Sequence, residues 1–246
     1  MPMTLPASQL ALLASGGLGL AGALGLAGAL GQQPAGLRVT VATNAPRQLL
    51  AGDETVWSSA AAIGWGEPPY TTGFRALWSA EGLWIRFDAA DPSPWHSYSH
   101  RDAPLWEEEV VEIFIDPDGD GRNYAEIEIS PANVVCDLLM LRGDPDKQGD
   151  LGWDFDGLRT AVHPWDIQGG GWTAIALLPW EGFAALPETE VRLPPLAGDS
   201  WRFNVFRIKR PHGPADPQRD LVLAAWSAVP AESFHVPEVF RTMVFE

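Results

Sequence analysis

Short runs rich in β-branched and aromatic residues recur along most of the chain, and turn-forming residues separate them. Two of the links, at residues 80–82 and 119–121, end in glycine, which adopts the positive φ angles of tight hairpins at low cost. Many short strands at this spacing, with few convincing helices between them, are typical of a β-sandwich. We therefore predict an all-β, antiparallel, jelly-roll-like sandwich. Its strands are expected at residues 37–42, 73–78, 82–89, 110–115, 124–130, 134–141, 158–163, 171–178, 200–210 and 242–245.

The strand predicted at residues 124–130 has one apolar and one acidic face. Side chains alternate along a strand, so Ala125, Ile127 and Ile129 share one side of the sheet, whereas Glu126 and Glu128 share the other. The first side is predicted to face the core. The second carries carboxylates, as a solvated, cation-binding or ligand-binding surface would.

The segment before that strand combines an aromatic residue with further acids. Trp106 follows a proline and precedes three glutamates at residues 107–109, a polar neighbourhood that favours exposure. Glu112 interrupts an apolar strand, and an unpaired buried carboxylate is costly. We expect Glu112 either to face solvent or to have a partner, and binding of a ligand hydroxyl is favoured over a structural salt bridge.

Residues 1–36 differ from the rest of the chain. They contain no charged side chain, and the sequence of residues 20–25 is repeated at residues 26–31. The apolar stretch of residues 10–30 has the length of a signal-peptide core, and small residues follow it. We predict export to the cell exterior, the periplasm or the cell envelope, with the folded domain at residues 37–246. Because no Lys or Arg precedes the stretch and glycines weaken it, an uncleaved anchor and a disordered leader remain alternatives.

The charge balance narrows the range of partners. The formal net charge is -16, from 32 acidic and 16 basic residues, which disfavours binding to nucleic acid or to an anionic membrane surface beyond an N-terminal anchor. The lone Cys136 excludes an internal disulfide and is read as a buried thiol in an apolar strand. The histidines show no spacing suited to zinc, so no transition metal is assigned.

The turn after residue 115 is rich in oxygen ligands. Asp116, Asp118, Asp120 and Gly121 reproduce the start of a calcium-binding loop, in which hard oxygen donors alternate. The position of the bidentate glutamate holds Ile127, and strands flank the loop, which argues against an EF-hand. A structural Ca²⁺ site in the turn and an empty acidic hairpin are equally compatible with this pattern.

Several segments, in this order along the chain, resemble the family 9 carbohydrate-binding modules and the DOMON-like β-sandwiches related to them. They lie at residues 78–85, 106–116, 124–130, 171–180, 201–205 and 225–240, so that the resemblance covers roughly residues 53–246 as a stand-alone module. It implies a β-sandwich that holds the end of a sugar chain between two aromatic side chains, with polar neighbours bonding to the hydroxyls and calcium ions serving the structure.

The resemblance also assigns candidate carbohydrate-binding residues. Trp106 matches the first clamp tryptophan, and Glu112 matches a sugar-contacting glutamate. The second clamp position holds Phe234, which offers a smaller flat face without an N–H donor, and His235 beside it could bond to a ligand. The family's sugar-binding arginine is replaced by Glu128, so we expect a changed pattern of hydroxyl recognition.

We therefore predict non-catalytic binding of a neutral saccharide by aromatic stacking. One alternative is an electron-transfer domain of the same fold family that binds haem b; Met140 or Met243 would be an axial ligand opposite His163, Lys209 or another donor. Another is a glycoside-active enzyme that uses the acidic sheet face, because glycosidases need a pair of carboxyl groups. Haem and catalysis are the minority predictions, and no catalytic residue is assigned.

Overall fold

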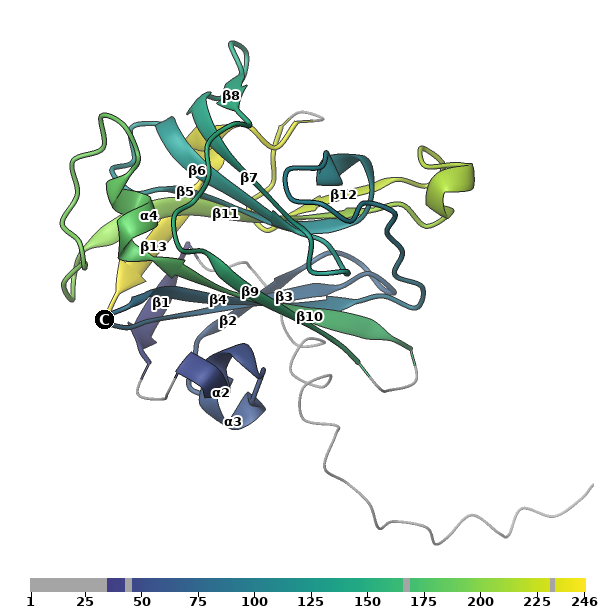
Figure 1. Cartoon of the computed structure of the whole chain (residues 1–246), viewed down its shortest axis with the longest axis horizontal. Coiled ribbons are helices and arrows are strands. Elements are labelled where there is room, and N and C mark those ends of the chain that lie inside the picture. Colours follow the sequence, from purple (N-terminus) through teal and green to yellow (C-terminus); the bar gives the residue numbers. More distant parts are fainter. Residues whose placement is uncertain (1–34, 43–45, 166–168, 231–232) are drawn as a thin grey trace, which may run out of the picture.

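Two β-sheets pack face to face in the computed structural model, which describes residues 35–42, 46–165, 169–230 and 233–246 (Figure 1). Each of the ten predicted strands is present, with small shifts at its ends. The all-β sandwich predicted from the sequence is confirmed. Residues 1–34, which hold the predicted leader, lie outside the described residues.

The first sheet forms the upper layer in Figure 1 and the second sheet forms the lower layer. In spatial order the first sheet contains β8 (Gln148–Asp150), β7 (Val135–Arg142), β6 (Arg122–Ile129), β5 (Val110–Asp116), β11 (Ser200–Lys209), β13 (Arg241–Phe245) and β1 (Gly36–Val41), with β12 (Val222–Ala225) paired to β11. The second sheet continues from β1 through β3 (Thr72–Trp78), β4 (Gly82–Ala90), β10 (Gly171–Pro179) and β9 (Arg159–Pro164), with β2 (Ala62–Trp65) paired to β3.

Strand β1 joins the two sheets and departs from the antiparallel rule. Its first residues run parallel to β13, with Leu37 opposite Met243, and its last residues run parallel to β3, with Thr40 opposite Leu77. The other strand pairs are antiparallel, as predicted. One edge of the sandwich is therefore closed by a strand that belongs to both layers.

The main hydrophobic core fills the space between the sheets. On β5 and β6 the inward positions include Ile113 and Ile127, which face Phe74 and Phe87 of the second sheet across the same cluster. Side-chain alternation was predicted to place the apolar residues of β6 in this core, and they do lie there.

The outer faces of both sheets are covered as well. Helices α2 (Pro46–Leu50) and α3 (Glu54–Trp57) cover the second sheet, where Trp57 is fully buried against Trp84. A short helix α4 (Trp180–Ala184) follows β10. The outer face of the first sheet carries its own apolar cluster, to which Phe114 and Phe206 belong, and residues 95–107, 221–230 and 233–240 lie over it. This covered outer face holds the candidate site.

Within the described residues, no helix is long and apolar enough to cross a membrane.

Candidate functional site

A cavity of about 460 Å³ opens on the outer face of the first sheet. Its floor comes from β5, β6, β7 and β11. Its walls come from the segment before β5, from residues 147–149 at β8, from residues 221–223 at β12 and from residues 233–235. The residues that line it are Trp106, Glu112, Glu126, Glu128, Leu138, Met140, Lys147, Gly149, Ile208, Arg210, Leu221, Leu223, Ser233, Phe234 and His235. The five binding residues predicted from the sequence are thus brought together in one cavity; their roles in binding remain predictions.

Trp106 forms part of the wall and is 37% exposed. It lies in a short 3-10 helix (Leu105–Glu107) directly before β5, where Leu105 is fully buried and anchors the turn. Arg210 donates a hydrogen bond from Nη2 to the Trp106 carbonyl oxygen at 3.0 Å. The backbone is thereby fixed while the indole ring stays accessible, as predicted.

The three glutamates that follow Trp106 do not form an open acidic surface. Their contacts hold a neighbouring loop in place. Glu108 accepts hydrogen bonds from the backbone N–H of Ser97 at 2.8 Å and from its hydroxyl. Glu107 accepts one from the Tyr98 hydroxyl at 2.9 Å. Glu109 is fully buried against Lys209. These contacts hold the loop of residues 95–98 beside the pocket wall.

Glu112, Glu126 and Glu128 form a buried carboxylate cluster in the pocket floor. Glu112 of β5 and Glu128 of β6 are cross-strand partners, and Glu126 precedes Glu128 on the same face. The carboxylate oxygens of the three lie within 4.8 Å of one another. Their side chains belong to residues that are only 2%, 4% and 0% exposed. Of the two expectations for Glu112, exposure to solvent is wrong, because the residue is buried beside two further acids. A ligand hydroxyl as its partner remains a prediction.

These carboxylates lack the hydrogen bonds that buried charges normally have. Oε1 of Glu112, Oε2 of Glu126 and both oxygens of Glu128 have no hydrogen-bond partner among the described residues. Burial raises the pKa of Glu112 and of Glu128 well above the usual range, and neighbouring carboxylates raise both further. The backbone of Trp106 lowers the pKa of Glu128 slightly, although its geometry falls short of a hydrogen bond. Burial also raises the pKa of Glu126 to about 7. The cluster therefore retains protons at neutral pH.

Phe234 and His235 line the pocket from the C-terminal segment. Phe234 stacks on Phe206 with ring centroids 4.3 Å apart and planes inclined by 16°, so one of its faces is already occupied. His235 stacks on Phe114 at 5.0 Å, and its Nδ1 lies 3.2 Å from the Tyr124 hydroxyl oxygen. Burial lowers the pKa of His235 to about 4, so the imidazole is neutral at pH 7. Phe234 is itself only 8% exposed and belongs to the outer apolar cluster, so it offers little aromatic face to a two-sided clamp.

The basic residues of the pocket do not neutralise the carboxylate cluster directly. Arg210 donates to the carbonyl oxygens of Pro217 and Trp106. Lys147 is exposed, and among the described residues it forms no salt bridge. Within the described chain, the nearest cationic candidate is His235, whose Nδ1 lies 3.9 Å from Oε2 of Glu126.

The residues proposed for axial haem ligation do not converge on a pocket. Met243 is fully buried in the core between the sheets. Met140 lines the pocket, but His163 lies on β9 of the other sheet, where its Nε2 is 2.7 Å from the Leu50 carbonyl oxygen. Lys209 is committed to a buried network with Asp91 and Glu109.

The turn between β5 and β6 gathers the predicted calcium ligands. Oxygens of Asp116, Asp118 and Asp120 lie within 4.8 Å of one another. Asp116 accepts backbone N–H bonds from Gly119 and Gly121, both at 2.9 Å, which hold its carboxylate toward the turn. Burial raises the pKa of Asp116 to about 6. The donor set of hard oxygens fits a calcium ion, and each of these oxygens has a further lone pair for a metal.

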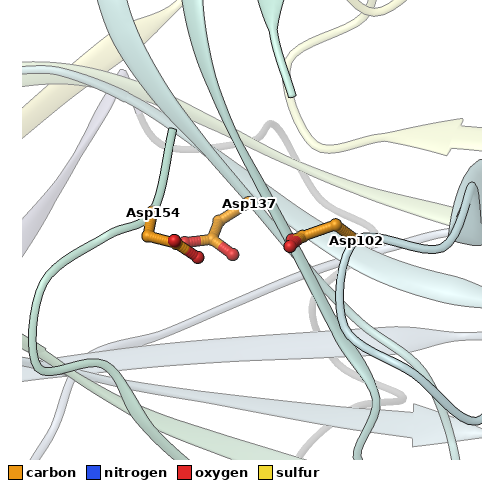
Figure 2. Close-up of side chains that lie close together, drawn as sticks. All are labelled: Asp102, Asp137 and Asp154. Atoms are coloured by element: carbon orange, nitrogen blue, oxygen red, sulfur yellow. The ribbon is translucent and has the colours of Figure 1, made fainter. Parts of the chain in front are cut away.

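A second acidic cluster lies at the edge of the first sheet and consists of Asp102, Asp137 and Asp154 (Figure 2). Arg101 fills this cluster: its guanidinium lies 2.5 Å from Asp137 and 2.9 Å from Asp154. The fully buried Asp137 also accepts the backbone N–H of Phe155 at 2.5 Å. This cluster ties the loop of residues 101–102 to β7, and a side chain already supplies its cation.

Three charged residues of the pocket, Glu126, Lys147 and Arg210, were not among the predicted site residues. Glu126 carries a detectable signal, because it shares a strand face with Glu128. Lys147 and Arg210 reach the pocket from loops or strand ends, where no periodicity indicates which way a side chain points.

Comparison with known proteins supports the resemblance noted in the sequence. Residues 52–135 match the profile of the family described as carbohydrate family 9 binding domain-like. The matched segment includes Trp106, Glu112 and Glu128, and it ends before Phe234 and His235. An extracellular protein of Arthroderma benhamiae is 28% identical over 189 residues, which cover 72% of this chain and 79% of that protein.

Solved structures share the fold at low sequence identity. A candidate carbohydrate-binding protein from Bacteroides uniformis aligns with a TM-score of 0.63 at 18% identity, over 86% of this chain and 99% of the other. A family 9 carbohydrate-binding module from Caldicellulosiruptor kristjanssonii, solved with cellotriose, aligns with a TM-score of 0.59 at 12% identity, over 86% and 93%. The same organism's module solved with glucose gives 0.57 at 14% identity, over 85% and 95%. The predicted sandwich is thus the fold of known carbohydrate-binding modules.

Proposed function

We propose that this protein binds a saccharide without catalysing a reaction, and that the pocket on the outer face of the first sheet is the binding site. The observation that carries the proposal is the convergence, in one cavity, of the accessible Trp106 ring and the carboxylates of Glu112 and Glu128. Pyranose C–H groups stack on flat aromatic faces, and carboxylates accept bonds from sugar hydroxyls. The match to a carbohydrate-binding family over the segment that holds these residues supports this assignment.

The arrangement of the acids supports binding and argues against hydrolysis. A glycosidase needs two carboxyl groups that flank the scissile bond. Here Glu112, Glu126 and Glu128 project from one face of two neighbouring strands and cluster together on one side of the pocket. The fold neighbours solved with glucose and cellotriose are carbohydrate-binding modules.

Two further features belong to this proposal. A calcium ion held by Asp116, Asp118 and Asp120 would stiffen the hairpin that carries the pocket floor, and the gathered oxygens support such a site. Export is supported by the apolar segment at residues 10–30 and by the name of the Arthroderma benhamiae relative, an extracellular protein. The protein would then meet its saccharide outside the cytoplasm.

A Trp106→Ala variant tests the binding site. A glycan array first identifies the best ligand, and titration calorimetry then compares the variants. We expect Trp106→Ala to weaken binding at least about tenfold, or roughly 1.4 kcal/mol, because the stacking face is lost. Trp106→Phe keeps a flat ring and should retain most of the affinity. Equal affinity of the wild type and Trp106→Ala would rule out this pocket.

A further inference from the structure

The floor of the pocket has an unusual charge for a site that binds neutral hydroxyls. Glu112, Glu126 and Glu128 together leave four buried carboxylate oxygens without a hydrogen-bond partner in the described part of the chain, and the three residues line a cavity. At the position of Glu128 the family resemblance leads one to expect an arginine, so the sign of the charge is reversed there. Buried polar groups are normally satisfied, which indicates that a ligand completes this cluster.

An ammonium group is the complement of such a cluster. Ionised carboxylates only accept hydrogen bonds, whereas a primary ammonium carries three donors and no acceptor. The number of donors equals the number of carboxylates in the floor. Hydrogen bonds between charged partners are about twice as strong as neutral ones, and a buried site increases the difference. A neutral hydroxyl can bond to the protonated cluster but does not stabilise its ionised form, whereas an ammonium group does.

The surroundings favour an ammonium group on a sugar ring over a bare metal ion. The cavity of about 460 Å³ is far larger than an ion, and Leu138, Met140 and Leu221 contribute apolar wall. A bare ion held by the three carboxylates would leave most of this cavity unfilled. Trp106 offers an aromatic face that attracts both C–H groups and cations.

We propose that the pocket takes a saccharide unit bearing a free primary amine, whose ammonium group lies against Glu112, Glu126 and Glu128 while its ring stacks on Trp106. The inference rests on the proposed saccharide binding and narrows it to amino sugars. Because the carboxylates retain protons in the free protein, binding of the ammonium group releases protons to the buffer.

The other titratable groups around the cluster do not replace the ammonium. Burial raises the pKa of the Tyr124 hydroxyl and of the Cys136 thiol, so both stay neutral. His235 is neutral at pH 7 because burial lowers its pKa to about 4. Arg210 is committed to two carbonyl oxygens. The exposed Lys147 carries a charge of the same sign as the ligand, and it lowers the pKa of Glu126 from the pocket rim.

Three matched oligosaccharides test the proposal by titration calorimetry. They share a β-1,4-linked pyranose chain and differ at C2, which carries an amine, an acetamide or a hydroxyl group. At pH 7 we expect the amine oligomer to bind at least tenfold more tightly than the other two, with uptake of the released protons by the buffer. At pH 5 the preference should shrink, because a lower pH opposes the proton release that binding of the ammonium group requires.

Isosteric variants distinguish the effect of the carboxylate cluster on binding from the effect of the protein's overall charge. Glu128→Gln should reduce the preference for the amine at least tenfold while leaving the melting temperature unchanged or higher. Glu190→Gln, a change of the same charge at an exposed position outside the pocket, should have no effect. Lys147→Met should strengthen binding of the amine oligomer, because it removes a like charge.

The outcomes distinguish this inference from the proposed function. Equal binding of the amine and hydroxyl oligomers, with both weakened by Trp106→Ala, would overturn the inference and leave saccharide binding intact. If none of the three oligosaccharides binds and the glycan array shows no ligand, both the inference and the proposed saccharide binding are overturned. Binding of Mn²⁺ or Ca²⁺ that is lost in Glu128→Gln and excludes the amine oligomer would identify a metal site and overturn the inference.

Discussion

Buried carboxyl groups make the stability of this protein depend on pH. Burial raises the pKa of Glu109 and of Glu126 to about 7 and holds those of Glu112 and Glu128 well above their usual range. A raised pKa means that the folded state binds protons more tightly than the unfolded chain. The stability is therefore fully present below the ordinary pKa of these groups, and it is lost as the pH rises through the raised values. His235 acts in the opposite sense, but its contribution is complete above pH 6.5.

We predict that the free energy of unfolding falls by about 1 kcal/mol or more between pH 6.5 and pH 8, given 1.36 kcal/mol for each pKa unit shifted. In Glu128→Gln the fall should be smaller and the stability at pH 8 higher, because a buried charge is gone and its neighbours lose a repulsive partner. Urea unfolding at both pH values measures this, with Glu190→Gln as the exposed control. If the free energy of unfolding falls between pH 6.5 and pH 8 as steeply in Glu128→Gln as in the wild type, the cluster does not titrate in this range.

For individual residues, the sequence predicted which side chains line the pocket better than it predicted their burial and their hydrogen bonds. The positions of Trp106 and Glu112 followed from the resemblance and from strand alternation. That Glu112 is buried without a partner could not be foreseen, because the covering segments, such as residues 221–240, come from distant parts of the chain. Strand periodicity indicates which face a side chain takes, but it does not indicate what lies over that face.

The hairpin of β5 and β6 connects the pocket to the proposed calcium site. Its strands carry Glu112, Glu126 and Glu128, and its turn gathers Asp116, Asp118 and Asp120. If calcium binds there with a dissociation constant of about 10 µM, 1 mM calcium adds about 2.7 kcal/mol of stability. We therefore predict that calcium raises the melting temperature by roughly 5–10 °C relative to a chelator.

Asp118→Asn removes one exposed oxygen charge from the turn and should abolish most of this calcium-dependent shift. Asp156→Asn changes the same charge at an exposed position outside the cluster and serves as the control. An identical shift in both variants would place the calcium elsewhere, and a wild type that does not respond to 1 mM calcium would remove the site from the account.

For the molecule as a whole, the strand pattern was enough to predict the sandwich. It did not predict that β1 joins the two sheets along one edge. The hairpins followed from glycine turns and alternation, and β3 with β4 and β5 with β6 are antiparallel neighbours, as predicted. The parallel pairing of β1 with β13 and β3 joins the two ends of the chain to the middle, and no local pattern encodes such a contact. The strands β2, β8 and β12 were missed because they are edge additions of only three or four residues, and in β8 and β12 none of the residues is buried.

We predict that removal of residues 1–34 leaves the melting temperature unchanged, whereas removal of residues 1–41 destabilises the protein. The longer deletion removes β1 with the buried Leu37 and Val39, which are 2% and 0% exposed. Two fully buried aliphatic side chains correspond to about 3–6 kcal/mol. Thermal unfolding of the two truncated proteins measures the difference. Equal stability would mean that β1 does not hold the sheets together.

The most direct test of the account is a crystal structure of the protein with the best-binding oligosaccharide. We expect a sugar ring stacked on Trp106 in the cavity over the first sheet, with a polar substituent within hydrogen-bond distance of Glu112 or Glu128. A saccharide bound at full occupancy on any other surface, with this cavity filled only by water, would contradict the central claim.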